Sequence, residues 1–343
     1  MDEASIFADN PLCRMFGIRY PVFQAGMGHV AYGDLAAAVS EAGGMGVIGT
    51  GYMSGEELRA EIDKVRARTD RPFGVDILFA RVEGRDATSV EYTAHVQALI
   101  DVTLDERVPV LVSGLGDPAG VIAQAHAQGM RVMSVVGNVR QARRMAEQGV
   151  DVIVASGADG GGHVGRVGTA VLVPAVADAV SVPVIAGGGI ADGRGLVAAL
   201  ALGASGVWMG TRFIATREAR GHDNYKHKLV EIGDEGTIVT RAHSGKTCRL
   251  VRNAFTDYWE AHAEQIQPHP HQLAAVGHPA SLKGRIEGDV EHGVLPAGQS
   301  VAMIHEVLPA GEVVRNVVRE AERIIGAWRA TAPRVPAARR PAP

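Results

Sequence analysis

The sequence predicts an α/β fold, namely a TIM (β/α)8 barrel with an inserted, mainly helical cap domain. Eight short runs rich in Val, Ile and Met alternate with longer helical patterns, and the runs are apolar throughout, as is typical of parallel strands buried on both faces. Eight strands with helices between them match a closed barrel, whereas an open doubly wound sheet does not require that number. The 43 glycines cluster directly after the apolar runs, where the chain must turn or approach a ligand closely.

The apolar runs place the strands, and helical periodicity with capping signals places the helices. Predicted strands lie at residues 21–24, 46–49, 73–77, 108–112, 131–135, 152–155, 184–186 and 206–209. Ser54 before an acidic first turn marks one helix start, and Asp117 before Pro118 marks another. Predicted helices lie at residues 34–42, 55–68, 89–104, 118–128, 138–148, 169–180, 193–202 and 312–330.

A long segment separates the eighth strand from the eighth helix. Residues 217–299 are richer in His, Tyr and charge, with helical patterns near 225–231 and 251–265, and they are too many for an ordinary loop. We therefore expect a helical cap or substrate domain at 217–299, inserted into a barrel made of residues 1–216 and 300–331. The Pro- and Arg-rich composition of residues 332–343 predicts a disordered tail.

Composition narrows the function classes. Thirty-four basic against 38 acidic side chains give a net charge of −4, which argues against a nucleic-acid partner. Two cysteines, Cys13 and Cys248, exclude a disulfide framework and a four-cysteine zinc site. We expect a cytoplasmic protein with no membrane partner, because the N-terminus lacks the basic and apolar regions of a signal peptide and no long apolar run exists. The histidines around the prolines near residue 270 are expected in a solvated loop, so no metal is predicted.

Glycine-rich turns follow the seventh and eighth predicted strands. Gly187, Gly188 and Gly189 follow the seventh, and Gly210 and Thr211 follow the eighth. In a barrel these two loops commonly form a phosphate site, because bare backbone N–H groups and a helix N-terminus face the anion. Tight turns without a ligand are the alternative, but two of them on adjacent strands favour a phosphate-bearing ligand.

Further candidates follow other strands. His163 comes after Gly161 and Gly162 at the sixth strand, where its imidazole can exchange a proton with a substrate oxygen or donate a hydrogen bond to it. Asp159 could orient this histidine or could simply be solvated. The first strand leads into Gln24, Ala25, Gly26 and Met27, against which a flat ring could lie. Asp76 ends the third strand and is either a site residue or a loop-closing carboxylate.

With these residues the chain resembles the nitronate monooxygenase (2-nitropropane dioxygenase-like) family, which includes the flavin-type enoyl-acyl-carrier-protein reductases. The matching segments are PVFQAGMG, EAGGMGVIG, RPFGVDI, GADGGGHVG, PVIAGGGIADGRG, GVWMGTRF and GDVEHGVLPAGQS. The resemblance implies an FMN-binding barrel, and dimerisation is a family-level expectation. It also implies that His163 is the active-site histidine and that Gln299 closes over the flavin. The implied FMN ligands also include Gln24, Ala25, Gly26, Met27, Asp76, Gly161, Gly162, Gly187, Gly188, Gly189, Gly210 and Thr211.

Two positions depart from the family pattern. Asp76 stands where many relatives carry Asn, which places a carboxyl beside the flavin ring. Val135 stands where some relatives place a Lys near the flavin, although the enoyl reductases are apolar there. Both departures bear on which of the family's activities is expected of this chain.

The resemblance and the residues together predict an FMN-dependent oxidoreductase with a small-molecule substrate. The leading hypothesis is a nitronate monooxygenase, in which an alkyl nitronate passes electrons to the flavin and O2 takes them back. The alternative is a reductase of an enoyl thioester that uses NADH or NADPH as electron donor; Lys226, Lys228 and Lys246 of the insert could then receive the phosphates of the thioester carrier. A barrel that binds a phosphate ligand without chemistry is the third hypothesis.

Overall fold

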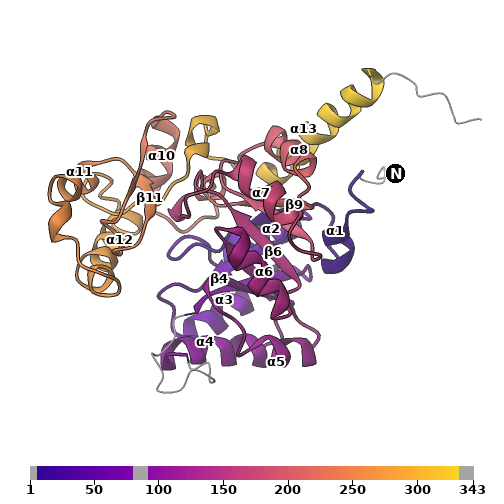
Figure 1. Ribbon diagram of the computed structural model, residues 1–343, viewed down its shortest axis with the longest axis horizontal. Coiled ribbons are helices and arrows are strands. Elements are labelled where there is room, and N and C mark those ends of the chain that lie inside the picture. The colour runs from indigo at the N-terminus through magenta and orange to yellow at the C-terminus, as the bar shows by residue number, and fades with distance from the viewer. Residues whose placement is uncertain (1–5, 80–91, 332–343) are drawn as a thin grey trace, which may run out of the picture.

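The structure is a computed structural model that describes residues 6–79 and 92–331. Within these residues, eight parallel strands form one nearly closed barrel in the order β1-β9-β8-β6-β5-β4-β3-β2. The predicted TIM-type α/β barrel is confirmed (Figure 1). Its strands are β1 (Val22–Gln24), β2 (Gly46–Gly49), β3 (Phe73–Phe79), β4 (Val110–Gly116), β5 (Arg131–Val136), β6 (Val152–Ser156), β8 (Val184–Gly187) and β9 (Gly206–Met209).

The barrel closes between β1 and β2 through few backbone contacts and one side chain. Phe23 and Met45 form an isolated parallel bridge. The amide of Gln24 reinforces this seam, because its Oε1 accepts from Val47 N at 3.1 Å and its Nε2 donates to Val47 O at 3.0 Å. Gln24 is fully buried, so its side chain serves the barrel wall rather than the space above it.

The outer helices follow the predicted pattern and differ mainly at their ends. Ser54 caps α3 as expected, and it forms a complete capping box with Glu57. The helix predicted from residue 118 begins only at Ile122, because Asp117 caps the turn at Ala119 instead. The helix predicted at 89–104 begins at Ala94 behind the cap Thr93, while residues 89–91 lie outside the described residues. The helices around the barrel are α2 (Gly33–Glu41), α3 (Gly55–Arg68), α4 (Ala94–Asp105), α5 (Ile122–Ala127), α6 (Val139–Glu147), α7 (Thr169–Ala177), α8 (Gly193–Ala201) and α13 (Ala310–Thr331); α1 (Pro11–Phe16) and α9 (Thr211–Ile214) are shorter.

The insert, residues 217–299, lies beside the barrel (Figure 1) and contains a small sheet as well as helices. Its strands β10 (Thr237–Thr240) and β11 (Cys248–Val251) are antiparallel, and β11 also pairs with the short strand β7 (Gly162–His163), which lies between β6 and α7 in the chain. Neither strand was predicted from the sequence, since each is only four residues long and includes polar residues. The other elements are α10 (Asp223–Glu231), α11 (Ala254–Ala261), η1 (Ala263–Gln265), the π-helical turn η2 (Leu273–Gly277) and α12 (His278–Arg285); η3 (Gln299–Met303) follows at the boundary.

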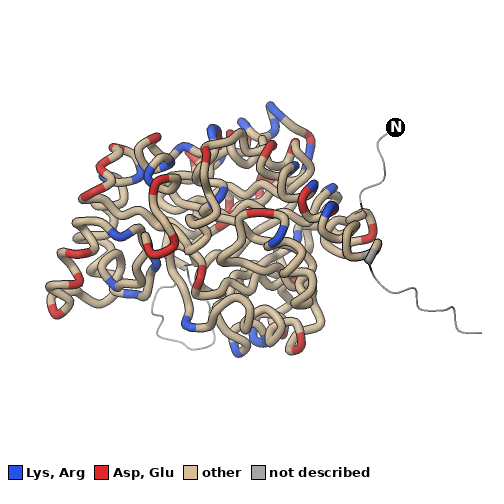
Figure 2. Tube along the Cα trace, turned by 90° about the horizontal axis from the view of Figure 1, so that it is seen from above, with Lys and Arg blue, Asp and Glu red and all other residues tan. Residues whose placement is uncertain are grey.

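The distribution of charge and the length of the apolar helices complete the description of the fold. Lys and Arg are intermingled with Asp and Glu along the described chain rather than separated onto two faces (Figure 2). No helix in residues 6–79 or 92–331 is both long and apolar enough to cross a membrane. The predicted tail at 332–343 lies outside the described residues.

Candidate functional site

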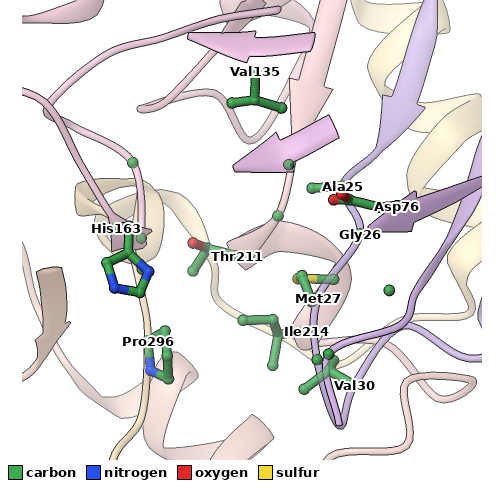
Figure 3. Close-up of a pocket in the computed structure, with 18 of the residues that line it drawn as sticks. Ala25, Gly26, Met27, Val30, Asp76, Val135, His163, Thr211, Ile214 and Pro296 are labelled. Atoms are coloured by element: carbon green, nitrogen blue, oxygen red, sulfur yellow. The ribbon is translucent and has the colours of Figure 1, made fainter. Parts of the chain in front are cut away.

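A cavity of about 270 Å³ lies where the barrel strands end and the insert begins. One side is made by the loops after the barrel strands, and the other by side chains of the insert, among them Tyr225, His243, Cys248 and Arg285. Figure 3 shows His163 and Asp76 on opposite sides of this space, with Met27 and Thr211 between them. Of the residues predicted from the sequence, the cavity is lined by Ala25, Gly26, Met27, Asp76, Gly161, Gly162, His163, Gly188, Gly189, Gly210 and Thr211.

Three predicted residues do not line the cavity. The side chain of Gln24 is hydrogen-bonded to Val47 in the β1–β2 seam, and Gly187 is the last residue of β8. Gln299 is exposed, and its neighbour Ser300 lines the cavity in its place. The expectation that the Gln299 side chain closes over this space therefore does not match its position.

The loop after β8 leaves an open backbone cradle. Gly188 and Gly189 have φ of 98° and 71°, in the left-handed region that favours glycine. A Cβ on Gly188 would lie 2.8 Å from Thr169 Oγ1 and 3.0 Å from Gly160 N, so a side chain has no room there. Across the cradle, Thr211 Oγ1 accepts from Gly298 N at 2.9 Å, which leaves its hydroxyl proton available to a ligand. Such a cradle suits a phosphate group.

His163 is held by a contact between the barrel and the insert. It faces Cys248 in the β7–β11 register. Its Nε2 lies 2.7 Å from Ser244 Oγ, and its ring packs edge-on against His243 with 5.8 Å between centroids. Asp159 does not orient it, because the Asp159 carboxylate accepts from Thr169 N at 2.7 Å instead.

The surroundings of His163 favour the uncharged imidazole. Burial by the surrounding protein lowers its pKa to about 4, and the positive charges of Lys246, His269 and Arg285 add to this effect. The residue is nonetheless exposed to solvent. At neutral pH the ring is therefore a hydrogen-bond donor and acceptor without charge.

Asp76 is a carboxyl without an ionic partner. Its side chain is 6% exposed, and Oδ1 has no hydrogen-bond partner among the described residues. Burial raises its pKa well above the usual range, while a hydrogen bond from the Gly114 backbone opposes the shift. A Cβ on either Gly26 or Gly114 would overlap the carboxyl, so both glycines are needed for it to fit. The structure thus favours the neutral acid form of this carboxyl.

Two insert residues of the site, His243 and Arg285, were not predicted from the sequence. His243 and Arg285 come from a loop and from the last turn of α12, and neither follows a predicted barrel strand. They reach the cavity only because β11 pairs with β7 and because Arg285 Nη1 donates to Gly28 O at 3.2 Å. No local pattern in the sequence signals these long-range contacts.

Comparison with known proteins adds to this geometry. Residues 9–320 match the model of the nitronate monooxygenase family. A (3aS,4S,5R,7aS)-5-hydroxy-7a-methyl-1-oxo-octahydro-1H-indene-4-carboxyl-CoA dehydrogenase of Mycobacterium tuberculosis is 33% identical, with 91% of this chain and 95% of the relative covered. A probable nitronate monooxygenase of Staphylococcus aureus is 32% identical, with 92% and 98% covered.

Two solved structures are similar over nearly their whole length. FabK from Thermotoga maritima superimposes with a TM-score of 0.84 at 36% identity, covering 94% of this chain and 99% of the other. Nitroalkane oxidase from Streptomyces ansochromogenes gives a TM-score of 0.81 at 29% identity, covering 92% and 99%. Both likenesses include the barrel and the insert.

Proposed function

The chain belongs to the nitronate monooxygenase family of oxidoreductases, and we propose that it is an FMN-dependent enzyme that oxidises alkyl nitronates with O2. The observation that carries this proposal is the uncharged imidazole of His163, which faces a cavity whose far side offers a phosphate cradle. A nitronate is already an anion, so it needs a hydrogen-bond donor rather than a base to remove its proton. His163 provides such a donor.

The residues present fit FMN. Gly188, Gly189 and Thr211 would hold the phosphate, because they line the cavity with bare backbone and a hydroxyl group whose proton is free for a ligand. The ring would lie against Ala25, Gly26 and Met27. Asp76 would complete the ring site, since its unpartnered Oδ1 needs a ligand. When bound, FMN supplies a two-electron acceptor that O2 can reoxidise.

We propose that Ser244 sets which nitrogen of His163 carries the ring proton. Ser244 Oγ accepts from Lys246 N at 3.4 Å, so its hydroxyl proton is free to be donated to Nε2 of His163. The ring proton then stays on Nδ1, and no described protein group hydrogen-bonds to that nitrogen. Nδ1–H is therefore the donor that would orient a nitronate oxygen. We further propose that the insert, 217–299, acts as the substrate domain, because it supplies Ser244 and the other wall of the cavity.

A reductase of an enoyl thioester that uses NADH or NADPH is the second candidate. The likeness to FabK and an apolar rim favour it: Leu78 and Leu115 line the cavity and are 47% and 38% exposed, as an acyl chain would require. Val135 adds an apolar contact in the same cavity.

Anaerobic mixing separates the two candidates. The FMN-loaded protein is mixed with propyl nitronate or with NADH, and the flavin absorbance is followed. We expect the nitronate to bleach the flavin and NADH to leave it oxidised. His163→Ala should retain the flavin and slow bleaching by about 100-fold, the lower end of the usual contribution of a positioned proton-transfer or hydrogen-bonding group. Bleaching by NADH, followed by reoxidation with an enoyl thioester, would establish the reductase instead.

A further inference from the structure

Arg285 is a buried cation without a counter-charge. The residue is 8% exposed and lines the cavity. Its guanidinium donates to Val294 O at 3.4 Å, to Gly28 O at 3.2 Å and to Ser281 Oγ at 3.4 Å. All three acceptors are neutral, and no carboxylate in residues 6–79 or 92–331 forms an ion pair with it. Since a buried charge is costly unless it is paired, this arrangement requires a source of negative charge.

His243 is the second unsatisfied group of the insert. It lines the same cavity and is 4% exposed, and neither Nδ1 nor Nε2 has a hydrogen-bond partner among the described residues. Burial holds its pKa well below the usual range, and the positive charge of Arg285 lowers it further. A neutral imidazole has one N–H to donate, so an oxygen acceptor from a ligand would satisfy it.

We propose that Arg285 and His243 form an anion site, which together with His163 receives the charged oxygen of the substrate. The inference rests on the proposed function, because it concerns the same cavity, and it deepens that function by naming the residues that would bind the substrate anion and select for its charge. The substrate class is a small monoanion that carries its charge on oxygen, such as a nitronate or a carboxylate. Arg285 supplies the positive charge, and the two imidazoles supply directed hydrogen bonds.

The distribution of charge in the cavity supports an anionic rather than a neutral substrate. The carbonyl of a thioester would satisfy one N–H group but would leave Arg285 without a counter-charge. The acidic residue that lines the cavity, Asp76, is a neutral acid packed against Gly26 and Gly114. It therefore does not supply the missing charge.

Binding of two unreactive probes tests the site. Titration calorimetry on the FMN-loaded protein compares propanoate with propanamide, which has nearly the same size and no charge. We expect propanoate to bind at least about tenfold more tightly, as a charge-assisted hydrogen bond allows. Arg285→Met should abolish this preference, Arg285→Lys should keep part of it, and His243→Leu should weaken propanoate binding by about fivefold.

Lys283→Met is the matched control, because Lys283 lies on the same helix α12 but is exposed and pairs with Asp289 at 3.2 Å. It should leave both affinities unchanged. Equal affinities for propanoate and propanamide in the wild type would overturn the proposal. A preference for propanoate over propanamide that stays at full strength in both His243→Leu and Arg285→Lys would also overturn it. If Arg285→Met does not fold, these two variants decide the question.

The outcome is separable from that of the nitronate experiment. If propanoate binds in an Arg285-dependent manner but no nitronate bleaches the flavin, the anion site stands and nitronate oxidation falls. If nitronate bleaches the flavin but propanoate shows no preference, the proposed function stands and the anion site falls.

Discussion

His163 and Ser244 are 81 residues apart in the chain, yet Nε2 of the first lies 2.7 Å from Oγ of the second. The contact exists because β11 of the insert pairs with β7, the short strand after β6, and brings the loop before Cys248 over the glycine-rich turn. One hydrogen bond thus couples the position of the insert to the proton on the imidazole. His163 and the wall of the cavity that the insert forms are therefore held together by this hydrogen bond.

Ser244→Ala tests this coupling. Without the hydroxyl, Nε2 loses its partner, so the ring is free to carry its proton on either nitrogen. We expect kcat for nitronate to fall by about tenfold at unchanged flavin content, which corresponds to one lost hydrogen bond. In ¹⁵N spectra of histidine-labelled protein, the His163 nitrogens should move towards a mixture of tautomers.

Ser40→Ala is the control for Ser244→Ala. Ser40 is equally buried, and its hydroxyl donates to Pro72 O at 2.8 Å, away from the cavity. Its loss should lower stability without changing the histidine spectrum. Unchanged nitrogen shifts in Ser244→Ala would mean that Ser244 does not set the tautomer.

Gly188→Ala should abolish tight FMN binding. The new Cβ would lie 2.8 Å from Thr169 Oγ1, at a φ of 98° that L side chains rarely adopt, so the cradle must deform. We expect FMN affinity to fall by at least about tenfold, which corresponds to about 1.4 kcal/mol. Equilibrium dialysis measures it.

Gly203→Ala provides the comparison for Gly188→Ala. Gly203 has a similar φ of 91° at the end of α8, and its Cβ would approach Ala177 rather than the cavity. Gly203→Ala should lower the free energy of unfolding by about 1–2 kcal/mol while leaving FMN affinity unchanged. Wild-type FMN affinity in Gly188→Ala would show that the phosphate binds elsewhere.

The sequence predicted the barrel because its signals are local. A strand such as Gly46–Gly49 is buried on both faces, so its residues must all be apolar or small, and this is visible in any window of the chain. The glycine turns after β8 and β9 follow the same logic, since a positive φ requires a particular residue type.

The insert half of the site could not be predicted in this way. The strands TIVT and CRLV are short and mixed in polarity, and the pairing of CRLV with β7 spans more than 80 residues. Arg285 lies on an ordinary helix, and its burial is visible only once Gly28 and Val294 are in place around it. Gln24 was expected at the cofactor for its position at a strand end, although its side chain turns into the barrel seam.

Gln24→Leu distinguishes these two roles of Gln24. The variant leaves the N–H and C=O of Val47 without their side-chain partner in a buried seam. We expect the free energy of unfolding to fall by about 3 kcal/mol in urea denaturation, with FMN affinity unchanged in the folded protein. Gln97→Leu, at an exposed helix position, should change stability by less than about 0.5 kcal/mol. Loss of FMN at unchanged stability would make Gln24 a ligand instead.

Asp76→Asn tests whether the buried carboxyl is neutral, through the dependence of stability on pH. In the unfolded chain Asp76 loses its proton above its ordinary pKa of 3.8, whereas burial raises the pKa of the folded carboxyl well above that value. Between these two pKa values the folded state binds more protons, so wild-type stability falls as pH rises. The Asn side chain does not titrate, so the stability of the variant lacks this dependence on pH.

The stability of Asp76→Asn relative to wild type should therefore increase from pH 5 towards neutrality, by up to about 1.4 kcal/mol per pH unit while the folded carboxyl remains protonated. Urea denaturation of FMN-saturated protein at several pH values measures the difference. Because an amide N–H replaces the acid O–H as donor, FMN affinity should stay within about threefold of wild type. A difference that does not change with pH would mean that Asp76 is ionised in the folded protein, and the cavity would then hold a negative charge facing Gly26.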